Sequence, residues 1–256
     1  MKILGIIPAR FGSSRFEGKP LVKIDGISMI ERVYRQCEKC TNLDYIAVAT
    51  DDKRIENHVV GFGGNVVMTS KKHSSGTERC AEALEILFID KNINFDVVIN
   101  IQGDEPFINP QQIDKLASIF NKNKINIATL KKKINSENDI FNPNVVKIVT
   151  DNFDNALYFS RSPIPYLRGI EQNKWIENNT FYKHIGIYAY SSTVLKEIVK
   201  LKTTKSENSE CLEQLRWLEN GFKIKVLETE FESISVDTPE DIEKIKYWLK
   251  QKNNKL

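Results

Sequence analysis

The sequence has no apolar run of about 18 residues, the length that crosses a membrane. A short apolar stretch near the N-terminus is followed by Pro8 and Arg10 without a small-residue cleavage site, so no signal peptide is indicated. We therefore expect a cytoplasmic protein with no membrane partner, and we interpret the N-terminal stretch as a buried strand.

The sequence also lacks a strong charge of either sign. Its 37 Lys and Arg are balanced by 34 Asp and Glu, which gives a formal net charge of +3. Proteins that bind duplex nucleic acid usually carry a stronger basic bias or a basic stripe. No nucleic-acid partner is expected, although a local basic pocket for a phosphate-bearing ligand is still possible.

Cysteine is scarce, with four in 256 residues. Cys37 and Cys40 have C-x-x-C spacing, but the sequence offers neither a thioredoxin-like context nor a second pair of zinc ligands. Cys37 continues the helical spacing of Met29, Ile30 and Val33, so we interpret it as a core residue.

What the sequence does contain is an alternation of strands and helices through its first half. Strands are predicted at 3–7, 45–50, 65–68 and 96–101, and helices at 28–40, 52–60, 76–90 and 110–121. Such alternation is typical of an α/β fold in which helices cover a mainly parallel sheet.

The second half follows a different pattern, in which strands succeed one another without long helices between them. Strands are predicted at 126–130, 145–150, 156–159, 184–190 and 223–228, a loop at 162–180, and helices at 192–200, 209–220 and 239–251. We predict one domain over residues 1–256, with an inserted antiparallel lobe at about 131–190.

The first chemically informative segment is IIPARFGSSRFEGKPL, at residues 6–21, directly after the first strand. Ligands of open parallel sheets bind beyond the carboxyl ends of the strands. Small residues such as Gly12 let backbone N–H groups approach phosphate oxygens, and Arg10, Arg15 and Lys19 supply positive charge. The segment matches neither a Walker A loop nor G-x-G-x-x-G. It predicts a triphosphate site; the alternative is a mobile basic surface loop.

Two carboxylates follow predicted strands and suit a metal ion. Asp104 stands in NIQGDEP after the strand at 96–101, and Asp237 stands in SVDTPED before the last helix. Mg²⁺ prefers one or two carboxylates together with substrate phosphate oxygens and water. We predict that Asp104 and Asp237 bind Mg²⁺, although Asp237 could instead only cap its helix.

Further polar clusters are less specific. Ser75, Gly76 and Thr77 open the helix at 76–90, where free N–H groups can receive a ligand or simply be capped. Arg161 could bind a carboxylate through two parallel hydrogen bonds. The other candidates have plain alternatives. His184 and Tyr188 lie four apart on one face of a strand, where a lone His is usually structural, and Glu213 and Gln214 could bind sugar hydroxyls or form a solvated helix face.

Eight segments follow one another along nearly the whole chain: IIPARFGSSRFEGKPL, SSGTERCAE, INIQGDEPFI, FNPNVVKIV, ALYFSRSPIPY, KHIGIYAY, CLEQLRWLENG and VDTPEDIEKI. Taken together in this order, they resemble the 3-deoxy-manno-octulosonate (Kdo) cytidylyltransferase family. The opening segment also resembles CMP-sialic acid synthetases, but two later segments, ALYFSRSPIP and LEQLR, favour the Kdo branch.

The resemblance implies a Rossmann-like nucleotidyltransferase fold with a dimerisation lobe, a homodimer, and transfer of CMP from CTP to Kdo with Mg²⁺ for lipopolysaccharide biosynthesis. By motif match it implies phosphate contacts from Arg10, Ser13 and Lys19 with Arg15 nearby, a cytidine pocket of Ser75, Gly76 and Arg79, and Mg²⁺ on Asp104 and Asp237. It implies a sugar site of Gln102, Arg161, His184, Tyr188, Glu213 and Gln214, with Gln102 also beside the nucleotide.

Two residues depart from the family pattern. Glu17 stands where Pro is usual, which adds negative charge to the phosphate loop, and Ser235 stands where Gly is usual. Two alternatives remain: a cytidylyltransferase for another acidic sugar, such as 8-amino-Kdo or a sialic-type nonulosonate, and a non-catalytic sugar-nucleotide sensor. A sensor would not need to keep both carboxylates and the full phosphate loop.

Overall fold

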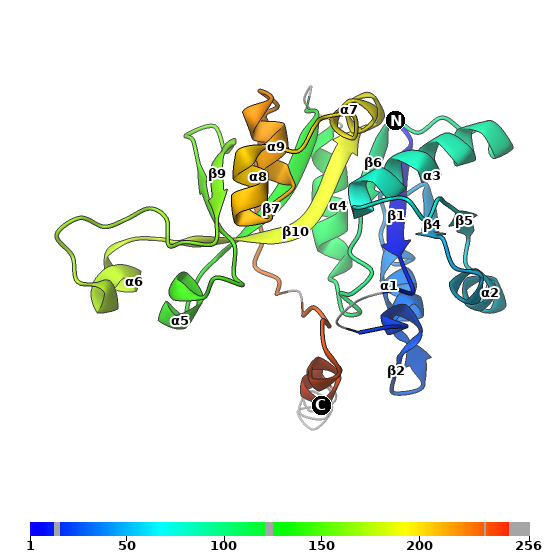
Figure 1. The fold of residues 1–256 in the computed structure, drawn as a ribbon, viewed down its shortest axis with the longest axis horizontal. Helices are drawn as coiled ribbons and strands as arrows, with labels where there is room; N and C mark the ends of the chain where they lie inside the picture. The colour runs from blue at the N-terminus through cyan, green and yellow to red at the C-terminus, as the bar shows by residue number, and fades with distance from the viewer. Residues whose placement is uncertain (13–15, 121–124, 233, 246–256) are drawn as a thin grey trace. The chain divides into compact units, whose positions relative to one another are not determined.

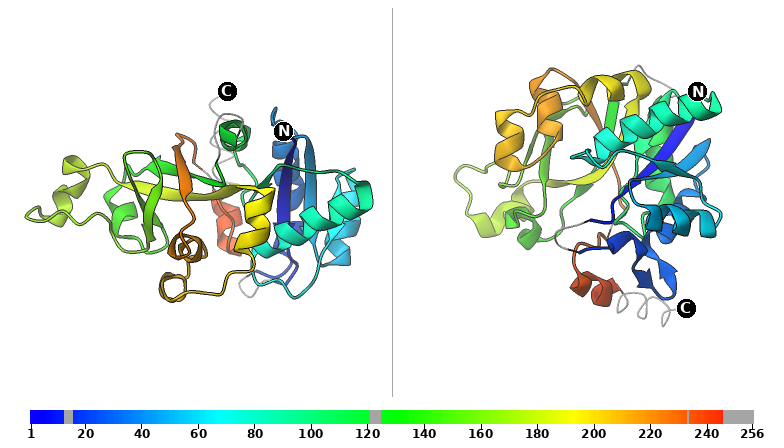
Figure 2. Two further views of the ribbon diagram at one scale, coloured as in Figure 1. Left: turned by 90° about the horizontal axis from the view of Figure 1, so that it is seen from above. Right: turned by 45° about the vertical axis from the view of Figure 1, so that its right-hand side comes forward.

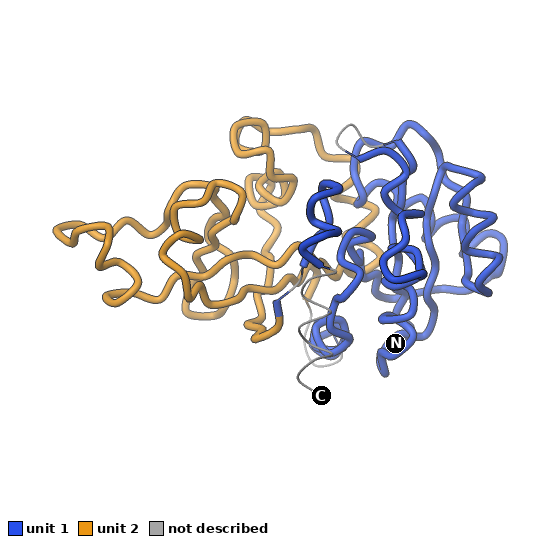
Figure 3. Tube along the Cα trace, turned by 90° about the horizontal axis from the view of Figure 1, so that it is seen from below, with its two compact units in different colours: residues 1–121, 232–256 blue, residues 122–231 orange. Residues whose placement is uncertain are grey.

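The computed structural model describes residues 1–12, 16–120, 125–232 and 234–245. Figure 1 shows the ribbon with its element labels. The chain forms two compact units, one of residues 1–121 and 232–256 and the other of residues 122–231 (Figure 3). The second unit includes the range 131–190 that the sequence assigns to an inserted lobe; the assignment of one domain carrying a lobe stays a prediction.

The first unit contains a parallel sheet. Its strands are β1 (Ile3–Ala9), β4 (Tyr45–Thr50), β5 (Val66–Met68) and β6 (Val97–Asn100), and β1 pairs with β4 and β6. Consecutive residues of β1 and β6 are buried, because both faces of the sheet are covered. This unit therefore has the predicted parallel α/β character.

The helices of the first unit follow the predicted order. They are α1 (Met29–Cys37), α2 (Lys53–Gly61), α3 (Gly76–Lys91) and α4 (Pro110–Phe120). The helix α3 packs across β1 (Figure 2). Cys37 is fully buried at the end of α1, which confirms its interpretation as a core residue.

A small hairpin in the first unit was not predicted. After the short 3₁₀ helix η1 (Lys19–Leu21), β2 (Lys23–Ile24) pairs antiparallel with β3 (Ile27–Ser28). Asp25 and Gly26 between them have φ of 48° and 81°. Asp-Gly is a strong signal for such a two-residue turn, because Gly adopts positive φ without a steric penalty.

The second unit is built mainly from antiparallel pairs. Its strands are β7 (Ile127–Lys133), β8 (Lys147–Thr150), β9 (Ala156–Ser160), β10 (Tyr182–Ser191) and β11 (Ile224–Glu228). The pairs β7–β10, β8–β9 and β8–β10 are antiparallel, and β11 pairs parallel with β7. The expected antiparallel piece is confirmed.

The predicted helix at 209–220 is wrong, because the chain forms two helices there. They are α8 (Lys205–Glu210) and α9 (Gln214–Glu219), and Cys211 between them has a left-handed φ of 52°. The helix predicted at 192–200 is present as α7 (Ser192–Ile198).

The predicted loop at 162–180 contains helical structure. It holds η2 (Gln172–Lys174) and α6 (Trp175–Asn178), and a short α5 (Glu137–Phe141) lies earlier in the unit. Trp175 is 2% exposed and stacks on Phe181 within a local apolar cluster. Burial of this indole anchors the segment, and residues 162–180 have no periodicity from which these short helices could be predicted.

The final helix is present over residues 239–245, and the rest of its predicted range lies outside the described residues. Over the ranges that the structure describes, no helix is both long and apolar enough to cross a membrane.

Candidate functional site

A pocket in the first unit collects residues from several distant segments. Its lining comes from the end of β1, η1, the loop before α3, the segment after β6 and the segment around Asp237. The lining residues are Pro8, Ala9, Arg10, Lys19, Pro20, His73, Ser74, Ser75, Gly76, Arg79, Gln102, Gly103, Asp104 and Asp237. Every predicted phosphate, cytidine and metal residue within the described part of the chain lies in this pocket. Ser13 and Arg15 lie outside the described residues.

Lys19 connects the two predicted metal ligands. Its ammonium nitrogen lies 2.9 Å from Asp104 Oδ2 and 3.4 Å from Asp237 Oδ1. It also donates to the Val236 carbonyl at 2.8 Å. The two carboxylates are therefore within reach of a single cationic group.

The backbone explains why Asp237 lies beside Asp104. The N–H of Val236 donates to the Asp104 carbonyl at 2.9 Å. Val236 is fully buried with Ile24, Met29 and other apolar residues, which attaches this segment to the hairpin and α1. Packing of Val236 thus positions the adjacent Asp237.

The N-terminus of α3 forms another wall of the pocket. Ser75 caps the helix by accepting the Glu78 N–H, and Ser74 donates to Glu78 through both its N–H and its hydroxyl. Gly76 follows the cap, so the first turn can expose N–H groups to a ligand. Ser75 and Gly76 line the pocket, and their contact with cytidine stays a prediction.

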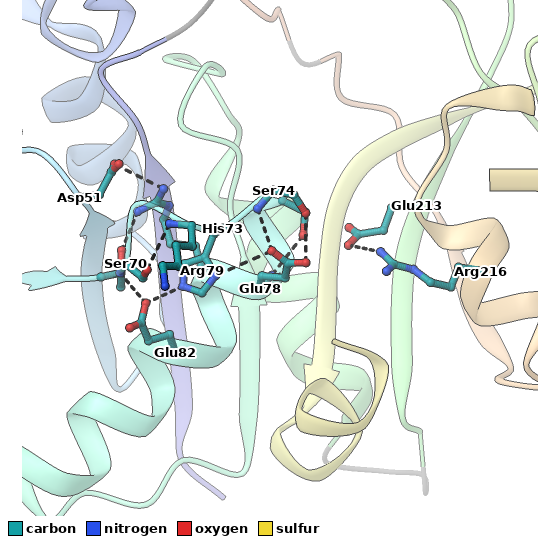
Figure 4. A network of polar contacts seen from close by, with 12 residues as sticks. Asp51, Ser70, His73, Ser74, Glu78, Arg79, Glu82, Glu213 and Arg216 are labelled. Atoms are coloured by element: carbon teal, nitrogen blue, oxygen red, sulfur yellow. Dashed lines mark hydrogen bonds and ion pairs between the residues drawn. The ribbon is translucent and has the colours of Figure 1, made fainter. Parts of the chain in front are cut away.

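Arg79 reaches this wall with its charge already paired. Its side chain is 6% exposed, and Nη1 donates to Thr69 Oγ1 at 2.6 Å while Nη2 lies 3.3 Å from Asp51 Oδ1 (Figure 4). A buried charge requires such partners. Arg10, by contrast, is exposed at the pocket rim and suits a phosphate.

Gly103 has no room for a larger residue. A Cβ there would lie 2.8 Å from the carbonyl oxygen of Pro8, a backbone atom that cannot move aside as a side chain can. We expect Gly103→Ala to lower the free energy of unfolding by about 1–3 kcal/mol in urea denaturation. Gly61→Ala, at a helix position with open space, is the matched control. Equal stability of the two variants would contradict the steric reading.

The predicted sugar residues, apart from Gln102, lie in the second unit. Arg161 follows β9, and its side chain is already engaged by backbone carbonyls. Nε donates to Glu210 O at 2.7 Å and Nη1 donates to Pro143 O at 3.0 Å. These bonds fix the direction of the guanidinium. Binding of a carboxylate by Arg161 through two parallel hydrogen bonds stays a prediction.

His184 and Tyr188 lie side by side on β10, with ring centroids 5.2 Å apart. An irregularity between Ile185 and Tyr188 pairs His184 with Lys131 and Tyr188 with Thr129 of β7, so the two rings remain on one face. Burial lowers the pKa of His184 to about 3, so the ring is neutral at physiological pH. Its Nε2 lies 2.9 Å from Thr129 Oγ1.

Glu213 and Gln214 open α9 and differ in their surroundings. Glu213 pairs with Arg216 at 2.9 Å (Figure 4), and Arg216 also lies 3.2 Å from Glu207. Gln214 is 5% exposed. A buried Gln214 excludes the alternative of a solvated helix face at this position; the sugar contacts of both residues stay predictions.

Sequence reasoning missed His73 in the loop before α3 and the two carboxylates that contact this loop. His73 lines the pocket, and Glu78 and Glu82 contact its loop from α3. The available signal was the spacing of Glu78 and Glu82, since residues four apart share one helix face.

Known proteins resemble this chain over nearly its whole length. The family model described as "Cytidylyltransferase" matches residues 4–245. A 3-deoxy-manno-octulosonate cytidylyltransferase of Parabacteroides distasonis is 54% identical, with 95% of this chain and 96% of the relative covered. That of Fusobacterium nucleatum is 50% identical, with both chains fully covered.

A solved structure has the same fold. It is a CMP:2-keto-3-deoxy-manno-octonic acid synthetase complexed with CTP, 38% identical, with a TM-score of 0.88, and the match covers 98% of this chain and all of the other. This match confirms the predicted nucleotidyltransferase fold, and together with the sequence relatives it confirms the resemblance. The chain belongs to the 3-deoxy-manno-octulosonate cytidylyltransferase family.

Proposed function

We propose that this protein transfers CMP from CTP to the anomeric hydroxyl of Kdo, giving CMP-Kdo and pyrophosphate. The observation that carries the proposal is the pocket of the first unit, in which a phosphate-binding segment, a helix N-terminus and two carboxylates converge. Its relatives, at about half identity over nearly their full lengths, carry that activity in their names.

The pocket suits a nucleoside triphosphate. Arg10 and Lys19 supply positive charge for phosphate oxygens, and Ser75 and Gly76 place the N-terminus of α3 in the pocket. Arg79, buried and paired with Asp51, holds this wall in place. We assign the phosphates to the side of Arg10 and Lys19, and the cytidine to the side of α3.

Asp104 and Asp237 fit a Mg²⁺ ion. Both carboxylates lie within 3.4 Å of one ammonium group, so they are close enough to share a cation. Over the described ranges, no group of three or more Asp, Glu, His or Cys side chains is arranged to hold a metal ion, so the other ligands would be phosphate oxygens and water. When bound, the ion would polarise the α-phosphate and neutralise its charge.

The protein's contribution to the reaction is positioning and charge neutralisation. The Kdo hydroxyl oxygen forms a bond to the α-phosphorus, the bond between that phosphorus and the β-phosphate oxygen breaks, and the hydroxyl proton is released. Lys19 and Arg10 stabilise the charge on the departing pyrophosphate. No covalent enzyme intermediate is required.

Within the second unit, the acidic sugar is assigned to the residues that the family resemblance implies. Arg161 supplies a fixed positive charge for the sugar carboxylate. His184, neutral at physiological pH, and the buried Gln214 suit hydroxyl groups, with Tyr188 and Glu213 beside them.

The cellular setting is also proposed. We place the enzyme in the cytoplasm as a homodimer that supplies CMP-Kdo for lipopolysaccharide biosynthesis. Large apolar side chains on the second unit support a subunit interface, since Phe153, Leu157 and Tyr166 are 76%, 61% and 72% exposed.

The direct test is pyrophosphate release from CTP and Mg²⁺ with Kdo, 8-amino-Kdo and a sialic acid compared in parallel. We expect release with Kdo to exceed the others by at least about 10²-fold, since lost polar contacts in a specific site cost that much. Release only with another acid would transfer the assignment to that sugar. No release with any of them would favour the sensor alternative.

A further inference from the structure

The loop before α3 forms part of the nucleotide pocket but has little apolar anchorage of its own. Thr69 to Ser75 read TSKKHSS, and Lys71 and Lys72 are exposed. His73, Ser74 and Ser75 nevertheless line the pocket. Something other than core packing must fix this wall.

Two carboxylates on successive turns of α3 contact the loop. Glu78 accepts the N–H and the hydroxyl of Ser74 at 2.7 and 3.0 Å. Glu82 accepts the N–H of Ser70 at 2.7 Å and lies 2.5 Å from His73 Nε2. The first turn of α3 therefore holds the end of the loop, and the second turn holds its beginning.

His73 joins these two attachments. Its Nε2 faces Glu82, and its Nδ1 lies 3.7 Å from Glu78 Oε2 (Figure 4). The side chain of His73 is 19% exposed. One ring that meets both carboxylates allows only a narrow range of loop conformations.

The charge of the Glu82 carboxylate also helps to restrict the conformation of the loop. Burial raises the pKa of its carboxyl, but the Ser70 N–H and His73 outweigh burial, so the pKa lies below its ordinary value. An ionised carboxylate makes stronger hydrogen bonds than a neutral acceptor. The pair Glu82–His73 is therefore charge-assisted.

We propose that Glu82 and His73 are positioning residues for CTP: Glu82 fixes His73 and the Ser70 backbone, and thereby the loop wall against which the nucleotide binds. Glu82 is absent from the pocket lining formed by the described residues, so it acts through the loop. The inference rests on the proposed function for the identity of the nucleotide.

The test is the affinity for CTP of Glu82→Ala, measured by calorimetry without sugar, together with steady-state kinetics. Removing the carboxylate leaves the Ser70 N–H and His73 without their acceptor, so we expect Kd and KM for CTP to rise about tenfold. KM for Kdo and kcat should stay within about twofold, because the chemistry and the sugar site are unchanged. Glu82→Gln, which keeps an acceptor, should recover most of the affinity.

Two comparisons separate positioning from general stability. Glu85→Ala, on the same helix but exposed, is the matched control and should bind CTP as the wild type does. His73→Ala combined with Glu82→Ala should weaken CTP binding by less than the product of the two single effects, since Glu82 acts partly through His73. Should Glu82→Ala fail to fold, Glu82→Gln must still show a smaller rise in Kd than His73→Ala.

An unchanged Kd for CTP in folded Glu82→Ala, or equal rises in KM for CTP and Kdo, would overturn the proposal. The affinity for CTP is measured without sugar and so without CMP transfer. The proposed transfer to Kdo and the proposed role of Glu82 can therefore fail independently of each other. CTP binding without pyrophosphate release would remove the proposed function and leave this inference standing.

Discussion

Asp104→Asn is expected to reduce kcat for CMP transfer by at least about 10³-fold, the upper end for losing one preorganised electrostatic group. The amide keeps the shape of the side chain but removes the negative charge that Mg²⁺ requires. Asp104 also pairs with Lys19, so the substitution disturbs both the metal site and the position of the ammonium group.

The fold of this variant should survive. The Asp104 side chain is 29% exposed, and a partly exposed ion pair contributes about 0–1 kcal/mol. Its backbone bond to Val236 uses the carbonyl, which the substitution leaves in place. Asp90→Asn, on the exposed end of α3, serves as the control. Wild-type turnover by Asp104→Asn would remove the metal assignment.

Lys19→Ala is expected to lose about 10²-fold or more in kcat. Lys19 faces Asp104 and Asp237 and accounts for much of the positive charge in the described pocket. Without it, the two carboxylates repel each other and the departing pyrophosphate lacks a stabilising charge. The loss should fall mainly on kcat, since this charge is needed most in the transition state.

Steady-state kinetics with varied CTP checks this expectation. Lys23→Ala is a suitable control, because Lys23 is an exposed lysine only four residues away. A loss below threefold for Lys19→Ala would count against its role. A large rise in KM with unchanged kcat would instead indicate ground-state binding of the triphosphate.

Much of the candidate site in the first unit could be predicted from the sequence. Polar residues that follow buried parallel strands meet at one edge of the sheet, which is why Arg10 after β1 and Asp104 after β6 lie in one pocket. The position of Asp237 was harder to predict, because it depends on the packing of Val236 and on the hydrogen bond from the Val236 N–H to the Asp104 carbonyl.

The pairings within the site were beyond sequence reasoning. Lys19 was expected to face phosphate, yet it contacts carboxylates 85 and 218 residues away. Residues this far apart in the sequence form no periodic pattern from which their contact could be predicted. The His73–Glu82 pair spans a loop and two helical turns, and only the loop conformation brings its members together.

Two secondary-structure predictions were wrong where tertiary structure overrode the local sequence pattern. The left-handed Cys211 divides a stretch that reads as one helix, and Trp175 anchors a segment that reads as a loop. The antiparallel character of the second unit was predictable, because its short strands follow one another too closely for parallel crossovers.

The central claim is that this pocket joins CMP to Kdo, and phosphorus NMR of a mixture of protein, CTP, Kdo and Mg²⁺ tests it most directly. The account predicts that the triphosphate signals disappear as one phosphodiester signal of CMP-Kdo and one equivalent of pyrophosphate form together. Conversion of CTP to free CMP or CDP, or unchanged CTP in the presence of folded protein, would contradict it.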